Sequence, residues 1–362
     1  MKLLNFDISN AGDEYRIFVS NQFTIPMTLS ENTPWFFVLK KLIFLLLTIH
    51  ISLASDAQNL LPENSFLSTY SIKNNDSILQ RPDKKRVYIA GGNTAIFYSG
   101  MLVALNQAWY KDFPRTSFHT FNDSREWLQV DKIGHAWTVY NLAKYSTAMW
   151  KWTGLQENKT LWIGGLSAMG YLTIIEFLDA HSIKWGWSWA DMGANLAGTG
   201  IFIAQEGAWH EQRIQFKFSS HIASYDPSIK KRANDLYGKS FVERIFKDYN
   251  SQTYWLSINL KSFVGESKLP QWLNLAVGYG ADGLLGGFEN KWTDGDPGFP
   301  INRSDIKRKR QFYLSPDIDL SKIKTNKKGL RILLDILNVL KIPAPALMLD
   351  SEGKLRAYGI YF

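Results

Sequence analysis

The chain has 362 residues, of which 45% are hydrophobic and 20% charged, so it can hold one large or two medium domains and is not disordered. Its 41 Lys and Arg against 33 Asp and Glu give a net charge of +8, which suits an anionic surface such as lipid headgroups. No nucleic-acid-binding motif accompanies the basic residues, so we expect no nucleic-acid partner. The absence of cysteine excludes disulfides and thiolate metal ligands, and the 14 Trp, 16 Tyr and 22 Phe are typical of membrane interfaces.

Residues 38–57 have the pattern of a secretory signal peptide. Two lysines precede the apolar run 42–53, and small residues follow it. Because a signal peptide begins a translated chain, we expect translation to start near Val38 and residues 1–37 to be an extension ahead of the true start. An uncleaved signal anchor is the alternative. Residues 58–86 are polar and rich in turn formers, which is typical of a linker.

Four apolar segments follow the linker. The first carries no charge over 24 residues, which is long enough to cross a bilayer. Glycines recur within these segments, and in lipid such small residues let helices approach closely. We therefore predict a membrane-type four-helix bundle within residues 87–212, with a soluble bundle of very apolar core as the alternative. The segments lie at 87–110, 133–152, 160–178 and 187–205.

Residues 213–362 have a different pattern, in which apolar and polar residues alternate with period two. Between the predicted strands, leucines from Leu330 to Leu340 mark one face of an amphipathic helix. The fold class is therefore α+β: the helical bundle, then a small antiparallel sheet packed by this helix. The aromatic end at 358–362 resembles the assembly signal of outer-membrane barrels, although fewer than the eight strands of a closed barrel are visible. The predicted strands lie at 254–261, 273–279, 312–320 and 355–362.

Ionisable side chains stand at helical spacing inside three of the apolar segments. Burying them is costly unless they satisfy one another, bind a ligand or face water. Residues three or four apart share one face of a helix, and an antiparallel bundle brings the ends concerned to one side. We therefore expect a polar cluster at one end of the bundle, formed by Asp131 with His135, Glu176 with Asp179, and Asp191 with Asn195.

Three interpretations of this cluster stay open. One imidazole and three carboxylates are ligands suited to a divalent metal such as Zn, Mn, Mg or Ca, and no other cofactor is indicated. Such a metal, or a carboxylate of raised pKa, could activate water for hydrolysis. Alternatively the cluster is structural, with Asp131 and Asp191 as early-turn acids that favour the helix dipole. The candidate metal ligands are Asp131, His135, Glu176 and Asp191.

The motif that runs from Asp131 through Glu176 to Gly198 resembles the YfiM-like family of predicted periplasmic lipoproteins and, more distantly, VanZ-like membrane proteins. The resemblance covers about residues 85–210, and the tail from 250 onward resembles the extension of Bacteroidetes-type members. It implies a cell-envelope location and a small helical bundle in or against a membrane, but no established activity. The lipoprotein cysteine is absent, so attachment would fall to the helices.

We therefore expect an exported, membrane-associated protein of the cell envelope, on the periplasmic face or in the outer membrane. Its activity is not defined by the sequence, and its expected partners are membrane lipid or envelope components. One alternative is a metal-dependent hydrolase that acts on an envelope lipid or glycan precursor. Another is a component of outer-membrane assembly or scaffolding, which the aromatic C-terminus favours.

Overall fold

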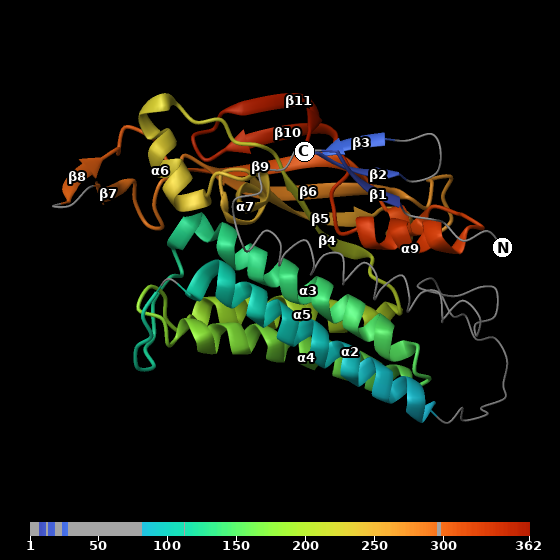
Figure 1. The fold of residues 1–362 in the computed structure, drawn as a ribbon. Helices are drawn as coiled ribbons and strands as arrows, with labels where there is room; N and C mark the ends of the chain where they lie inside the picture. Colours follow the sequence, from blue (N-terminus) through green and yellow to red (C-terminus); the bar gives the residue numbers. More distant parts are fainter. Residues whose placement is uncertain (1–6, 12–13, 19–23, 28–81, 112, 295–297) are drawn as a thin grey trace.

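The computed structural model describes residues 7–11, 14–18, 24–27, 82–111, 113–294 and 298–362. Over these residues it combines eight helices with a six-stranded antiparallel sheet (Figure 1). The prediction of a chain that mixes helices with an antiparallel sheet is confirmed. The predicted signal peptide lies outside the described residues, as does most of the linker. Ahead of it, three short strands form an antiparallel sheet of their own: β1 (Asp7–Ala11), β2 (Glu14–Phe18) and β3 (Thr24–Met27).

The four predicted apolar segments form the four longest helices, which lie together on one side of the sheet (Figure 1). The first begins a few residues before the expected start and ends in a π-helical turn, Asn106–Tyr110. By length and composition α2 and α4 could cross a membrane, a test that buried core helices also pass. The helices are α2 (Lys84–Leu105), α3 (Val130–Lys151), α4 (Glu157–Asp179) and α5 (Trp189–Trp209).

Helix α3 packs against both α4 and α5. Tyr140 and Phe202 lie in the shared core, and glycines set the helix spacing. A Cβ atom on Gly164 would lie 2.0 Å from Thr147 Oγ1, and one on Gly198 would lie 2.3 Å from the carbonyl oxygen of Ala136. These contacts require glycine, because any larger residue would force the backbones apart.

The sheet has the strand order β11-β10-β9-β6-β5-β4, and every neighbouring pair is antiparallel. The predicted strands correspond to β5, β6, β9 and β11, whereas β4 and β10 were not predicted. The strands are β4 (Ile214–Ser220), β5 (Gln252–Asn259), β6 (Leu273–Asp282), β9 (Lys309–Ile318), β10 (Ala344–Asp350) and β11 (Leu355–Tyr361).

The two faces of this sheet differ in chemistry. On one face Phe216 and Tyr254 pack toward α3. On the other, Lys217 and Asp317 form a fully buried ion pair of 2.8 Å. Four strand spacings separate β11 from β5, about 19 Å in a flat sheet, yet Tyr361 Oη lies 2.9 Å from Thr253 Oγ1 on this face. The sheet therefore curls around its polar face.

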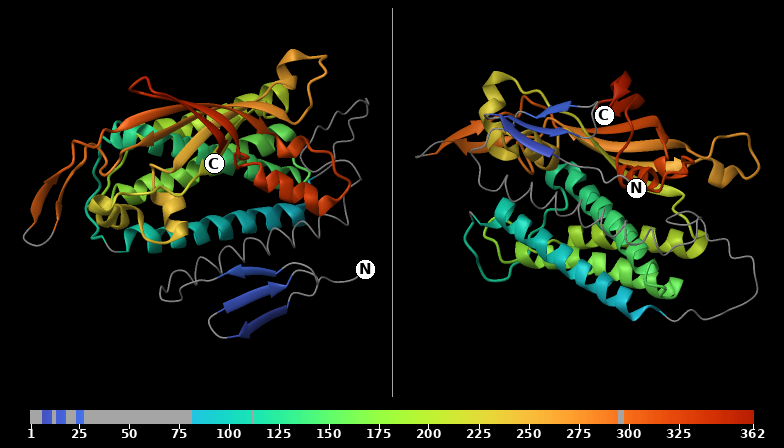
Figure 2. Two further views of the ribbon diagram at one scale, coloured as in Figure 1. Left: turned by 90° about the horizontal axis from the view of Figure 1, so that it is seen from above. Right: turned by 45° about the vertical axis from the view of Figure 1, so that its right-hand side comes forward.

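Shorter elements surround the sheet (Figure 2). Helix α7 begins with a capping box in which Ser240 and Glu243 bond each other's backbone amides. These elements are α6 (Pro227–Tyr237), α7 (Phe241–Lys247), α8 (Lys261–Val264), α9 (Lys328–Leu337) and the hairpin of β7 (Lys291–Asp294) and β8 (Phe299–Asn302).

The orientation of α9 differs from the prediction. Its polar residues Asp335 and Asn338 are buried, whereas Leu333 and Leu337 are exposed. The reason lies beneath the helix, where the curled sheet offers polar partners: Asn338 Nδ2 donates to Gln215 Oε1 at 2.6 Å and to Asp319 Oδ1 at 3.0 Å. The apolar face of α9 therefore does not pack on the sheet.

Candidate functional site

The start of α3, the end of α4 and the start of α5 meet at one end of the helical layer. Ser188 caps α5, because its Oγ accepts a hydrogen bond from the amide of Asp191 at 3.0 Å. The same hydroxyl donates to Asp123 Oδ1 at 2.5 Å, and the amide of Ser188 donates to Glu176 Oε2 at 3.4 Å. One serine thus contacts carboxylates from the loop before α3 and from α4, and it also caps the helix that carries Asp191.

Lys132 lies at the centre of the carboxylates. Its Nζ is 2.5 Å from Asp123 Oδ2 and 3.0 Å from Asp131 Oδ2. It is also 2.9 Å and 3.0 Å from the two oxygens of Asp191. These carboxylates raise the pKa of Lys132 above its usual value against the effect of burial, so the ammonium stays charged.

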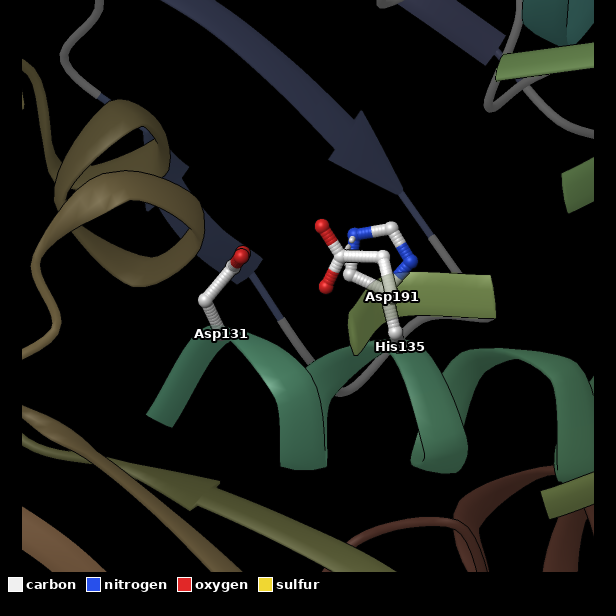
Figure 3. A group of neighbouring side chains, drawn as sticks. All are labelled: Asp131, His135 and Asp191. Carbon is white, nitrogen blue, oxygen red and sulfur yellow. Dashed lines mark ion pairs between the residues drawn. The ribbon is translucent and has the colours of Figure 1, made fainter. Parts of the chain in front are cut away.

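His135 lies one turn further along α3 and faces the other two helices. Its Nδ1 is 3.3 Å from Asn195 Oδ1 and 3.6 Å from Glu176 Oε1, while its Nε2 is 3.8 Å from Asp191 Oδ1. Asp131 and His135 rise from the same side of α3, and Asp191 reaches toward them from α5 (Figure 3). One ligand atom from each of these three residues can be chosen so that all lie within 4.8 Å of one another.

We call Asp123, Asp131, Lys132, His135, Glu176, Asp191 and Asn195 the helix-end cluster. Three of its buried polar atoms, Glu176 Oε1, Asp191 Oδ1 and Asn195 Nδ2, have no hydrogen-bond partner among the described residues, although Asp191 Oδ1 forms an ion pair with Lys132. Buried groups of this kind normally bond to protein, water or a ligand. Four carboxylates face one ammonium and one imidazole. If every carboxylate were ionised, the cluster would have a net negative charge even with His135 protonated.

Proton affinities in the cluster reflect this excess of acid. Burial raises the pKa of Glu176 to about 8 and that of Asp191 to about 7, against the favourable charge of His135. Burial also disfavours charge on His135 and Asp131. For His135 the nearby carboxylates, Asp191 first, outweigh burial and raise its pKa; for Asp131 the charges of His135 and Lys132 outweigh burial and lower its pKa. At neutral pH the cluster therefore holds protons that a bound cation could replace.

Asp179, the sixth predicted residue, has a different partner. Its Oδ1 accepts a hydrogen bond of 2.7 Å from Tyr110 Oη, at the end of the π-helical turn. Burial raises the pKa of Asp179 to about 7. Beside this pair lies a cavity of about 220 Å³, whose lining includes Tyr110, Phe177 and His181. Asp179 thus bonds to a residue that lines this cavity, Tyr110, and is not itself among the lining residues.

The structure brings five of the six predicted residues together, all except Asp179. Helical spacing predicted no role for Lys132, for Asp123 or for Tyr249, whose hydroxyl donates to Asp131 Oδ1 at 3.0 Å. Lys132 follows Asp131 directly, and adjacent helical residues point away from each other, so spacing alone does not predict their contact. Its long stem reaches back to the carboxylates. Glu206 and His210 lie at the other end of α5, where Glu206 pairs with Lys151 at 2.6 Å.

The C-terminal half fixes the segment that leads into α3. Trp127, Leu128 and Gln129 all have positive φ, between 49° and 64°, which is unfavourable for side chains of this size. Tyr279 Oη donates to the carbonyl oxygen of Leu128, and Arg310 donates to Gln129 Oε1 at 2.7 Å. Strands β6 and β9 therefore help to set the position of the cluster.

Comparison with known proteins adds one finding. Residues 120–205 match the model of a family described as predicted periplasmic lipoprotein (DUF2279). The matched segment contains the whole helix-end cluster and supports an exported, envelope-associated location. No curated protein and no solved structure matches the chain.

Proposed function

We propose that this chain is an exported, membrane-associated protein of the cell envelope whose helix-end cluster binds a divalent cation. The observation that carries the proposal is the approach of Asp131, His135 and Asp191 to within 4.8 Å, beside a buried oxygen of Glu176 that lacks a hydrogen bond. An imidazole with several carboxylates suits Zn²⁺ or Mn²⁺.

Charge supports cation binding. The cluster has more carboxylates than positively charged side chains. Protons offset this excess of negative charge at neutral pH, because the pKa values of Glu176 and Asp191 are raised to about 8 and about 7. A divalent cation could offset the same excess. Lys132 opposes metal binding, because its ammonium already contacts Asp131 and Asp191. A metal would therefore share these carboxylates with the ammonium or displace it, and Lys132→Gln should increase metal affinity.

Membrane association is supported by apolar surface in both halves of the chain. Val277, Leu314 and Leu347 are opposite one another on neighbouring strands and are 41% to 49% exposed. Helix α2 is also apolar, and Ala90 is its one buried residue, so most of its surface is accessible. Exposed apolar patches of this kind mark interaction or membrane surfaces. The YfiM-like and VanZ-like relationships are part of this proposal and rest on the motif between Asp131 and Gly198.

The test is titration of purified protein with Zn²⁺ and Mn²⁺ by calorimetry, at pH 8. We expect one ion per chain for the wild type and for Asp335→Asn, a buried acid outside the cluster. The double variant Asp131→Asn, His135→Gln should lose the binding. If the wild type binds no metal while the double variant only loses stability, the cluster is structural and the proposal is wrong.

A metal-dependent hydrolase is the second candidate, and Glu176 favours it. A carboxyl group with a pKa of about 8, lying 3.6 Å from His135 Nδ1, can exchange a proton at neutral pH, as a general acid or base must. The assay is hydrolysis of a p-nitrophenyl phosphate ester with Zn²⁺ or Mn²⁺. Activity that Glu176→Gln abolishes, while metal binding persists, would support an enzyme.

A further inference from the structure

Helix α9 presents its apolar side to the exterior. Leu330, Leu333 and Leu337 recur at the spacing of one helical face, and each is between 39% and 50% exposed. The opposite side is fixed by polar contacts, in which Asn338 bonds to Gln215 and Asp319, and Tyr145 Oη donates to the carbonyl oxygen of Asp335 at 3.3 Å. The helix therefore cannot bury its leucines by turning without breaking these bonds.

Basic residues surround the start of the same helix. Lys322, Lys324, Lys327, Lys328 and Arg331 lie in and just before α9, and Asp335 is the single acid of the helix. Lys324, Lys327 and Lys328 are exposed, whereas Asp335 is buried. The accessible charge at this end of the leucine face is therefore strongly positive.

We infer that α9 lies in the interface of an anionic lipid bilayer, with its leucines in the acyl region and its lysines at the headgroups. An exposed apolar helix face beside a cluster of lysines is the pattern of interfacial helices. A protein partner would be expected to find hydrogen-bonding groups as well, yet the three leucines offer only hydrocarbon. The inference rests on the proposed membrane association and specifies the surface responsible for it.

The test is flotation with vesicles of phosphatidylcholine alone and of phosphatidylcholine mixed with phosphatidylglycerol. We expect the wild type to bind the anionic vesicles, and the double variant Leu333→Gln, Leu337→Gln to bind at least about tenfold more weakly. The double variant Lys324→Gln, Lys327→Gln should lose roughly fivefold per lysine. The matched control is Phe241→Gln, Phe246→Gln on α7, whose two side chains are each 60% exposed, and it should bind like the wild type.

A local readout is available because the chain has no cysteine. An environment-sensitive dye on Leu333→Cys should shift to shorter wavelength when anionic vesicles are added, and a dye on Phe246→Cys should not. Wild-type binding that neither double variant reduces would overturn the role of α9 and leave membrane association standing. Absence of wild-type binding to either vesicle would overturn both. A dye shift at Leu333→Cys that depends on protein concentration without vesicles would overturn the inference in favour of a second copy.

Discussion

Tyr249, just before β5, donates a hydrogen bond of 3.0 Å from its hydroxyl to Asp131 Oδ1, in the first turn of α3. This bond joins the C-terminal half to the helix-end cluster. It also occupies the one oxygen of Asp131 that Lys132 does not contact. The cluster is therefore assembled by both halves of the chain.

Removing that hydroxyl tests the connection. Tyr249→Phe should lower the free energy of unfolding by about 1.5–3 kcal/mol, because a half-buried carboxylate loses a donor. Urea unfolding measures the change. Tyr88→Phe, on an exposed side chain of α2, is the control and should stay within about 0.5 kcal/mol of the wild type. Equal effects of the two substitutions would contradict a specific role for the bond.

Lys132 is expected to dominate the stability of the cluster. Lys132→Met leaves three carboxylates without their shared ammonium, which should cost about 3–5 kcal/mol at pH 7. Lys231→Met breaks exposed ion pairs with Asp235 and Asp294 and should change stability far less, because solvent screens exposed pairs. Thermal and urea unfolding of both variants give the comparison, and a small loss for Lys132→Met would argue against a buried ionic centre.

Stability should fall as the pH rises from about 5 to 8. The folded-state pKa of Glu176, about 8, lies above its ordinary value of 4.5, so the folded protein binds more protons than the unfolded chain in this range. The raised pKa values of His135 and Asp191 act in the same direction. Glu176→Gln should therefore have a flatter stability profile and exceed the wild type in stability at pH 8. A wild type that gains stability over this range would contradict the assignment.

A bound divalent cation should reverse this trend. At pH 8 the metal competes with fewer protons, so Zn²⁺ or Mn²⁺ at about one hundred times its dissociation constant should stabilise the fold by about 2.7 kcal/mol. At pH 5 the protonated cluster should respond much less. The melting temperature with and without metal checks this at both pH values. The same gain in Asp131→Asn, His135→Gln would assign the effect to another site.

Two glycines of α4 should respond oppositely to the same substitution. In Gly164→Ala the new methyl group would meet Thr147 at 2.0 Å, so we expect a loss of about 1–3 kcal/mol. In Gly170→Ala it meets nothing within 4 Å, so helix propensity should add about 0.5–1 kcal/mol. Denaturant unfolding of both variants is decisive, and a loss at Gly170→Ala would contradict the open space there.

Helical periodicity and local capping are properties of the sequence, and they predicted the four long helices, the Ser188 cap and the approach of Asp131, His135, Glu176, Asp191 and Asn195 at one end. These features depend on residues a few positions apart. Other features depend on contacts between distant segments. Such contacts determine where the ammonium of Lys132 lies and how the sheet curls. They also place the polar surface beneath α9. Only the tertiary structure decided that a lysine fills the centre of the cluster and that the leucines of α9 face outward, because both depend on which polar partners the fold brings within hydrogen-bonding distance.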